Sequence, residues 1–300
     1  MENKKELILK IGEKIISEKG YTKTTIDEIA KKSGIGKGTF YLYFKNKEDL
    51  FLSIIENGLE ISFFISERVR ENNDFLDKFD GILYLIPMRD EVDILEIIKK
   101  KNKQLMIIGA RVDGFNYVAV DNKKGVEEAI KHLIEYGHRK IGGIFFPISY
   151  FDGYERYRYF IETIERYNLV AKEGWIKIMK EYWAENWKKE AKELMREILK
   201  EKEKPSVIFC SSALATIGVK ELLDEEKEKI SLIGFDDFYL ARYLKPPITV
   251  ISQPVWDIGR NGINKLVEII EKGGKCELLL EPILIIRKSV KREEVKKDEK

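Results

Sequence analysis

The chain has 300 residues, of which 35% are charged and 44% hydrophobic, and its formal net charge at pH 7 is +2. This length suffices for about two domains with sizeable cores. The near-neutral total excludes a protein that binds polyanions through its overall charge. The charge is uneven, however, because residues 1–47 contain eleven lysines against six acidic residues. Composition therefore favours the N-terminal segment for contact with a nucleic acid.

The cysteine content indicates a reducing compartment, and the hydrophobic runs indicate that the chain does not span a membrane. Cys210 and Cys276 are too few for a disulfide framework, and both lie in apolar runs. No apolar run approaches the length that crosses a membrane, and residues 1–5 begin no signal peptide, so we expect a cytoplasmic protein. Abundant Lys, Glu and Ile with only two Gln lean toward the ion-pair-rich surface of a thermophile.

After a first helix over residues 3–19, the sequence predicts two short helices joined by a glycine-containing turn. Thr25 and Glu28 have the spacing of a capping box, in which the threonine hydroxyl accepts from a first-turn amide. Gly34 ends this helix, and the next begins near Lys37. Such a pair is either an ordinary helical hairpin or a helix-turn-helix, which places its second helix in the major groove. Surface tyrosines and helix-weakening glycines on the second helix favour the helix-turn-helix.

The run GYTKTTIDEIAKKSGIGKGTFYLYFKNKEDLF closely resembles the DNA-binding domain of TetR-type repressors, over roughly the first fifty residues. The resemblance implies binding to double-stranded DNA, with a homodimer on a palindromic operator. We expect Lys37 and Thr39 nearest the base edges, with Gly38 allowing close approach. Side chains expected at phosphates are Thr25, Tyr41, Tyr43 and Lys47.

A fourth helix is predicted from Asn46 to about residue 70, and the pattern then changes. Short apolar runs alternate with amphipathic segments, which predicts βαβ units and a parallel sheet covered on both faces. The strands are expected at residues 81–86, 104–109, 118–120, 141–146, 206–210, 231–234 and 249–252. The helices are expected at residues 91–101, 123–136, 153–167, 185–202, 213–223 and 255–272.

Three segments resemble the effector-binding domain of LacI-type repressors: DNKKGVEEAIKHLIEYGHRKIG (121–142), SLIGFDDFYLARYLKPPITVISQPVWDIGRNGINKLVEII (231–270) and LLEPILIIRKS (279–289). The resemblance implies a two-lobed, parallel-sheet α/β domain with the type I fold of periplasmic sugar-binding proteins. The chain therefore looks like a multidomain chimera. We expect an all-α, three-helix reader at 1–47, a connecting helix and linker at 48–79, an effector-binding and dimerisation domain at 80–290, and a charged tail at 291–300.

The LacI-type resemblance implies four ligand-binding residues. Asp236 matches a family Asp that hydrogen-bonds the ligand, and Arg156 matches the family's ligand Arg. Trp183 matches an aromatic position that stacks on the ligand, and Asp121 is a weaker match at the end of its strand. A carboxylate, a guanidinium and an aromatic plane suit a sugar, nucleoside or purine-like effector. The alternatives are turn capping for Asp236, an ion pair with Glu155 or Glu162 for Arg156, and core packing for Trp183.

Three departures from the LacI-type pattern weaken this assignment. The family's first two βα units, which precede the position of Gly81, are missing, so the N-terminal lobe is expected to be truncated. The family's N-D-x-x-A segment reads SALAT at 212–216, without its Asp, and the Gly after the ligand Arg is Tyr159. The domain is therefore either an effector sensor or a dimerisation scaffold alone.

The sequence carries no convincing catalytic or metal site. Its two histidines, His132 and His138, fall at structural positions of the LacI-type pattern, and no cluster has metal-ligand spacing. Asp236 and Asp237 are adjacent and point apart in most backbones, so they make a poor acid/base pair. We therefore expect no enzyme, the rival being one that processes sugars or nucleosides, and no cofactor. The expected function is a transcriptional regulator, a repressor, dimerising through residues 213–223 and the stretch near Tyr239–Tyr243.

Overall fold

The computed structural model describes residues 4–19, 23–47, 49–50, 53–54, 66–180 and 184–293. The chain divides into two compact units, Met1–Ile65 and Ser66–Lys300, and each is described by itself. Among the described residues, no helix is long and apolar enough to cross a membrane.

The first unit contains the three predicted helices, α1 (Lys4–Lys19), α2 (Ile26–Lys32) and α3 (Lys37–Tyr41). Thr25 caps α2 as predicted, because its hydroxyl accepts from the amide of Glu28 at 3.3 Å. Gly34 follows with φ +63°, a left-handed conformation that glycine adopts without strain. The helices are held by a buried apolar cluster of Ile8, Ile15, Ile29, Phe40, Phe44 and Leu50.

The predicted continuous helix from Asn46 to residue 70 falls mainly on residues 48, 51–52 and 55–65, which lie outside the described residues. Its last residues belong to α5 (Ser66–Glu71), which begins the described part of the second unit. Arg70 at the end of α5 forms an ion pair of 2.9 Å with Asp93 of α6 (Val92–Lys100).

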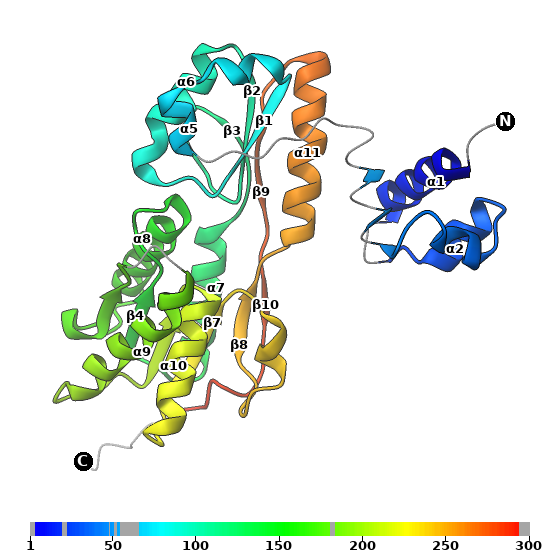
Figure 1. Ribbon diagram of the computed structural model, residues 1–300. Helices are drawn as coiled ribbons and strands as arrows, with labels where there is room; N and C mark the ends of the chain where they lie inside the picture. Colours follow the sequence, from blue (N-terminus) through cyan, green and yellow to red (C-terminus); the bar gives the residue numbers. More distant parts are fainter. Residues whose placement is uncertain are drawn as a thin grey trace. The chain divides into compact units, whose positions relative to one another are not determined.

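The second unit has two lobes, each built on one sheet (Figure 1). In the described chain, the N-terminal lobe has four parallel strands in the order β1-β2-β3-β9, with β1 as an end strand. These strands are β1 (Gly81–Leu85), β2 (Gln104–Ile108), β3 (Asn116–Val120) and β9 (Glu277–Leu280). The small sheet agrees with the predicted truncation of this lobe.

The C-terminal lobe has six described strands in the order β10-β8-β7-β6-β4-β5, parallel except for β10 against β8. They are β4 (Ile141–Phe145), β5 (Ile176–Ile178), β6 (Val207–Cys210), β7 (Ser231–Phe235), β8 (Thr249–Ser252) and β10 (Ile283–Ile285). The chain passes between the lobes three times, after β3, after β8 and after β9 (Figure 1). The strands β5, β9 and β10 were not predicted as strands.

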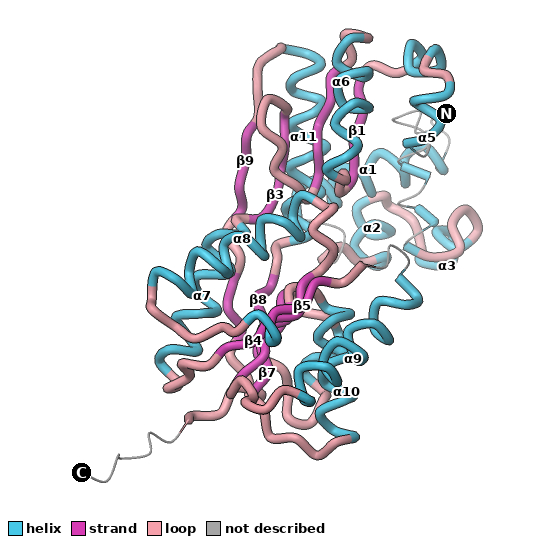
Figure 2. The backbone as a smooth tube through the Cα atoms, turned by 90° about the vertical axis from the view of Figure 1, so that its left-hand side faces the viewer, coloured by secondary structure: helices cyan, strands magenta, loops and turns pink. Residues whose placement is uncertain are grey.

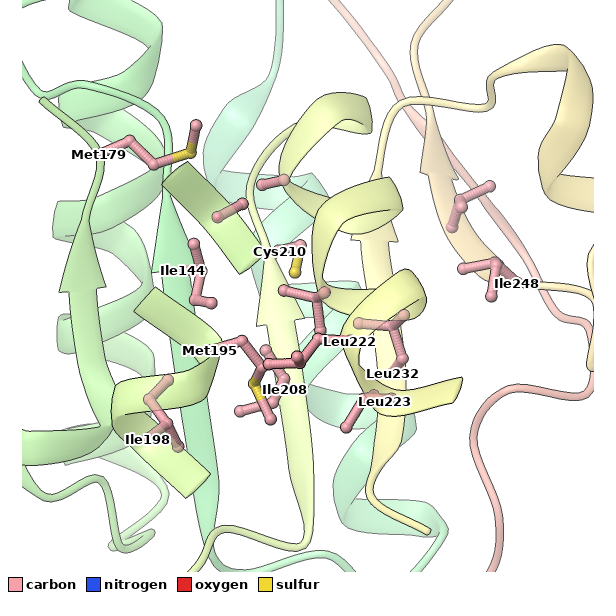
Figure 3. Packing of buried hydrophobic residues seen from close by; sticks show 14 of the residues in the cluster. Ile144, Met179, Met195, Ile198, Ile208, Cys210, Leu222, Leu223, Leu232 and Ile248 are labelled. Atoms are coloured by element: carbon pink, nitrogen blue, oxygen red, sulfur yellow. The ribbon is translucent and has the colours of Figure 1, made fainter. Parts of the chain in front are cut away.

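Helices cover both faces of the six-stranded sheet, as the apolar runs predict. On one side lie α7 (Asn122–Glu135) and α8 (Phe151–Arg166), and on the other lie α9 (Ala184–Lys200) and α10 (Ala213–Glu225) (Figure 2). Alternate strand residues serve the two faces of the sheet. Phe209 packs with α7 and α8. Ile208 and Cys210 pack with α9 and α10 (Figure 3). The N-terminal sheet packs against α6 and α11 (Val255–Lys272). Short 3-10 helices complete the unit at Asp74–Lys78, Arg89–Glu91, Glu173–Trp175 and Tyr239–Arg242.

Candidate functional sites

The surface of α3 presents two glycines that the fold itself does not require. A Cβ added at Gly38 would meet no atom within 4 Å, and one at Gly36 would meet only the Thr39 hydroxyl at 4.0 Å. Gly36 has φ −73°, which any residue adopts. Glycine weakens a helix start, so its presence here needs another reason. Close approach of an outside molecule to this backbone is such a reason.

The tyrosines of this segment lie on its surface while the neighbouring phenylalanines are buried. Tyr41 is 49% exposed and Tyr43 38% exposed, whereas Phe40 and Phe44 lie in the core. This alternation leaves two hydroxyl-bearing rings beside the exposed glycine backbone, where they can contact phosphates.

Both predicted DNA-contacting lysines are held by neighbouring groups. The Lys37 ammonium lies 2.9 Å from Asp27 Oδ1, and this carboxylate raises the pKa of Lys37. Both side chains are more than half exposed, so the pair contributes little to stability and exchanges readily for another acceptor. The Lys47 ammonium donates to the carbonyl of Thr24 at 2.9 Å, which ties the segment after α3 to the start of α2.

A polar cluster lies where the strands of the C-terminal lobe end, and Arg156 is its centre. Its Nε donates to Asn122 Oδ1 and its Nη1 to the Ser211 carbonyl, each at 2.8 Å. Its guanidinium carbon also lies 4.0 Å from the ring centre of Phe235. The side chain is buried, and its acidic neighbour is Asp152 at 3.4 Å. An ion pair with Glu155 or Glu162 is therefore not what holds Arg156.

Asp236 follows β7 directly and has φ +77°, a strained conformation for a residue with a side chain. Its carboxylate accepts from the Gln253 amide and, at 3.3 Å, from the backbone amide of Ala213. The adjacent Asp237 turns to Arg287, at 2.7 Å. The two carboxylates have separate partners, which agrees with their expected failure to form a catalytic pair.

The other two predicted ligand residues have different outcomes. Asp121 caps α7, because its side chain accepts from the Lys124 amide at 2.9 Å. The cluster is instead joined by its neighbour Asn122, whose amide donates to Glu155 at 2.9 Å. Trp183 lies outside the described residues.

The predicted departures from the LacI-type pattern have structural roles. Tyr159 is buried in the core between α8 and the sheet. Ser212 begins α10, with its hydroxyl accepting from the Ala215 amide at 3.3 Å. His138 bridges Ser206 and the Lys291 carbonyl at 2.8 and 2.9 Å, which is a structural position as expected.

Sequence reasoning missed two carboxylates of the cluster, Asp152 and Glu155. Burial raises the pKa of both, opposed in Asp152 by Arg156 and in Glu155 by the Asn122 hydrogen bond. The signal was present, since Asp152 and Arg156 have the i, i+4 spacing of a helical ion pair. It was overlooked because an acidic residue in a first helical turn is ordinary.

The two lobes meet beside this cluster, through residues that follow β1. Met88 forms a β-bridge with Tyr150, and the Arg89 amide donates to the Ser149 carbonyl at 2.6 Å. The Arg89 guanidinium lies 4.0 Å from the ring centre of Tyr154 on α8. From the N-terminal lobe, Arg111 acts on Glu155, lowering the pKa that burial raises. Residues of the N-terminal lobe therefore flank the cluster despite its short sheet.

Family comparison matches two parts of the chain. Residues 130–290 match the model of the periplasmic binding protein-like domain, and residues 8–54 match that of the tetR family of bacterial regulatory proteins. Among the described residues, no group of His, Cys, Asp and Glu could hold a metal ion.

Curated relatives include transcriptional repressors. The HTH-type transcriptional repressor PurR of Haemophilus influenzae is 29% identical over 238 residues, covering 75% of this chain and 69% of the relative. PurR of Photorhabdus laumondii is 30% identical over 222 residues, covering 71% and 64% respectively.

Solved structures with the same fold include a regulatory protein of the LacI family from Chloroflexus aggregans. It has a TM-score of 0.67 and 24% identity, covering 77% of this chain and 85% of that one. A LacI family transcriptional regulator from Enterococcus faecium with bound ribose has a TM-score of 0.60 and 20% identity, covering 76% and 83%.

Proposed function

The chain belongs to the family of periplasmic binding protein-like domains and carries a TetR-type N-terminal domain, and from this premise we propose that it is a transcriptional repressor controlled by a small-molecule effector. The observation that carries the proposal is the joining of two matched parts in one chain, a DNA-reading helix pair and a two-lobed sensor. We assign it to the cytoplasm, and the thermophile origin remains a prediction from composition.

On DNA, we assign base contacts to Lys37 and Thr39 and a close backbone approach to Gly38. The exposed pair between Lys37 and Asp27 supports this role, because an exposed ion pair is weak enough to yield to a guanine edge. Phosphate contacts fall to Thr25, Tyr41, Tyr43 and Lys47. An ammonium has three N–H donors, so Lys47 can donate to a phosphate while it is hydrogen-bonded to Thr24.

The effector is assigned to the cluster around Arg156 and Asp236, with Trp183 as a stacking partner. The strained backbone of Asp236 and the buried charges of the cluster support a binding role, since such features concentrate at functional sites. We now assign Asp121 to helix capping, with Asn122 taking its place. An effector that binds more tightly to one separation of the lobes shifts the equilibrium toward that conformation. The shift changes the affinity of the protein for its operator.

The protein is proposed to work as a homodimer on a palindromic operator. Leu222 does not contribute to its interface, because this side chain is fully buried in the lobe's own core. Ala213 and Ile217 of the same helix are half-buried and stay candidates, together with the exposed rings of Tyr239 and Tyr243, whose centres lie 5.3 Å apart. Light scattering on Tyr239→Asp should show a monomer, and an intact dimer would exclude this stretch.

A competing reading makes the two-lobed domain a dimerisation scaffold alone. An enzyme that processes sugars or nucleosides is disfavoured, because the matched relatives are transcriptional regulators. The buried cluster favours a sensor over a scaffold, since a scaffold needs no strained Asp beside a buried Arg.

The test of DNA reading compares three lysine variants on an operator selected from random sequence. Lys37→Ala should relax sequence preference, whereas Lys47→Ala should weaken all sequences alike and reduce the slope of log K against log salt by about one. Lys10→Ala removes an exposed lysine of α1 and is the charge-matched control. Equal loss of preference in the first two variants would contradict this division of roles.

A further inference from the structure

Acidic groups outnumber cations in the cluster at the ends of the C-terminal lobe's strands. Asp152, Glu155 and Asp236 contribute three carboxylates, and Arg156 is the cation bonded within them. Two further guanidinium groups act on Glu155, but each faces a carboxylate of its own, Arg111 with Asp113 and Arg158 with Glu162. Arg156 is directed inward, because it donates to an amide oxygen and a backbone carbonyl and stacks on a ring. An anionic effector would therefore meet repulsion from the carboxylates, because Arg156 is turned inward and Arg111 is already paired with Asp113.

Asp152 is the member of the cluster whose hydrogen bonding is incomplete. The residue is 9% exposed, and its Oδ2 lies 3.4 Å from Arg156 Nη2, a long ion pair. Its Oδ1 is buried and makes no hydrogen bond with any described residue. A buried, unbonded carboxylate oxygen is uncommon in proteins, and it can be satisfied by a water molecule or by a ligand that binds from outside.

When Asp152 is ionised, the partner of this oxygen is a hydrogen-bond donor, and charge decides which kind. A neutral hydroxyl would satisfy the oxygen but leave the excess negative charge of the cluster uncompensated. A cation both donates the hydrogen bond and compensates the negative charge. A charge-assisted hydrogen bond to a buried carboxylate is also stronger than a neutral one. Asp236 lies near enough to raise the pKa of Asp152, so a cation there interacts favourably with both carboxylates.

We propose that the effector is a small cation, an amine or guanidinium compound, whose charged nitrogen donates to Asp152 Oδ1 between the two lobes. The inference rests on the proposed function, in which this cluster is the effector site. It assigns a ligand class distinct from the neutral sugars and purines that the fold by itself suggests.

The proposal implies a proton linkage. Burial and Asp236 raise the pKa of Asp152 while Arg156 opposes them, and Glu155 is the other carboxylate on the same helix. A cation binds the ionised carboxylate, so its affinity should increase as pH rises through the pKa of Asp152. At a pH below that pKa, binding should release a proton.

The experiment is calorimetric titration of the full-length protein with matched pairs: glucosamine against glucose, and putrescine or agmatine against 1,4-butanediol. We expect at least one amine to bind at least tenfold more tightly than its neutral partner, with an affinity that increases with pH. Asp152→Asn should reduce this affinity at least tenfold. Glu162→Gln, an acid-to-amide change on the exposed face of α8, should leave it unchanged.

The remaining outcomes separate the inference from the proposed function. If a neutral sugar, nucleoside or purine binds and Asp152→Asn leaves its affinity unchanged, the sensor stands and the cationic class is wrong. If no amine binds, the inference is overturned; if the neutral compounds also fail, the effector function is overturned with it. If Asp152→Asn unfolds the protein, Asp152→Glu replaces it, and unchanged amine binding by that variant at any pH would overturn the assignment to Oδ1.

Discussion

The two lobes of the second unit differ in how completely each buries its sheet. In the C-terminal lobe, every residue of β4, β6 and β7 is buried. In the N-terminal lobe, the end strand β1 leaves Leu83 40% and Leu85 62% exposed, and the end strand β10 of the C-terminal sheet likewise leaves Ile283 64% exposed, so the lobes differ in how many fully buried inner strands they have. The described acidic cluster belongs mainly to the complete lobe. The comparison indicates that rigidity for the site comes from the C-terminal lobe, whereas the N-terminal lobe contributes residues that flank it.

The largest expected difference between the lobes is in core truncation. Leu222→Ala in the C-terminal lobe should lower the free energy of unfolding by about 2–5 kcal/mol, since it leaves a cavity in a closed core. Leu85→Ala, at an exposed position of β1, should change it by no more than about 0.5 kcal/mol. Urea denaturation of both variants measures the difference. Equal losses would mean that β1 is covered in solution.

The second prediction removes the guanidinium from the site. Arg156→Met should destabilise the protein by about 3–5 kcal/mol at neutral pH, because Asp152 is left as a buried charge without its cation. The pKa of Asp152 is raised in the folded state, and without Arg156 it rises further. The stability that depends on protonated Asp152 is present below its ordinary value of 3.8 and is lost as pH rises through the folded-state pKa. The loss in Arg156→Met should therefore grow with pH over this range.

The double variant with Asp152→Asn is the control for this interpretation, because it removes the uncompensated charge. It should recover part of the stability at neutral pH and flatten the pH dependence. If the double variant is no more stable than Arg156→Met at any pH, the cost arises from lost packing on Phe235 rather than from charge.

A smaller effect is expected at His138, which is hydrogen-bonded to the carbonyl of Lys291 in the segment that follows β10. Burial lowers the pKa of His138 below its ordinary value of 6.5, although Glu293 opposes the shift. The unfolded chain then binds a proton that the folded chain does not, so stability is present above pH 6.5 and is lost as pH falls below it. His138→Gln cannot titrate, and its stability should fall less than that of the native chain between pH 7 and pH 5. Parallel pH profiles would contradict this assignment.

The fold was predictable where local signals and burial agree. The helix after Thr25 has a strong capping signal at its start. The strand at residues 207–210 is wholly apolar in sequence and wholly buried in the structure. The strand at residues 176–178 reads Ile-Lys-Ile and is only half buried, and β9 begins with an exposed Glu277. These short edge strands are specified by pairing with distant residues, which periodicity within one segment does not reveal.

The candidate site was predictable only in part. Arg156 and Asp236 were named from a resemblance, and the structure places both at the carboxyl ends of the strands of one lobe. Asp121 was named although its adjacent Asn122 bonds Arg156, because position along a strand end does not show which of two neighbours turns inward. The i, i+4 spacing of Asp152 and Arg156 indicates an ion pair, but the role proposed for Asp152 required the structure, because the spacing does not show that Oδ1 lacks a hydrogen bond.

A small effect on stability is expected where the lobes meet. Arg89→Ala removes the contact of a guanidinium with the Tyr154 ring, which should lower the free energy of unfolding by about 0.5–1 kcal/mol. The backbone bond from Arg89 to Ser149 remains, so the lobes keep part of their link.

The separation of the lobes should respond more than stability does, and small-angle scattering of the variant should show a larger radius of gyration. Arg89→Lys retains the charge but not the planar group, and the same increase in that variant would attribute the link to stacking. An unchanged radius in both would mean that the backbone bridge of Met88 with Tyr150 is sufficient to hold the lobes, leaving the effector itself to set their separation.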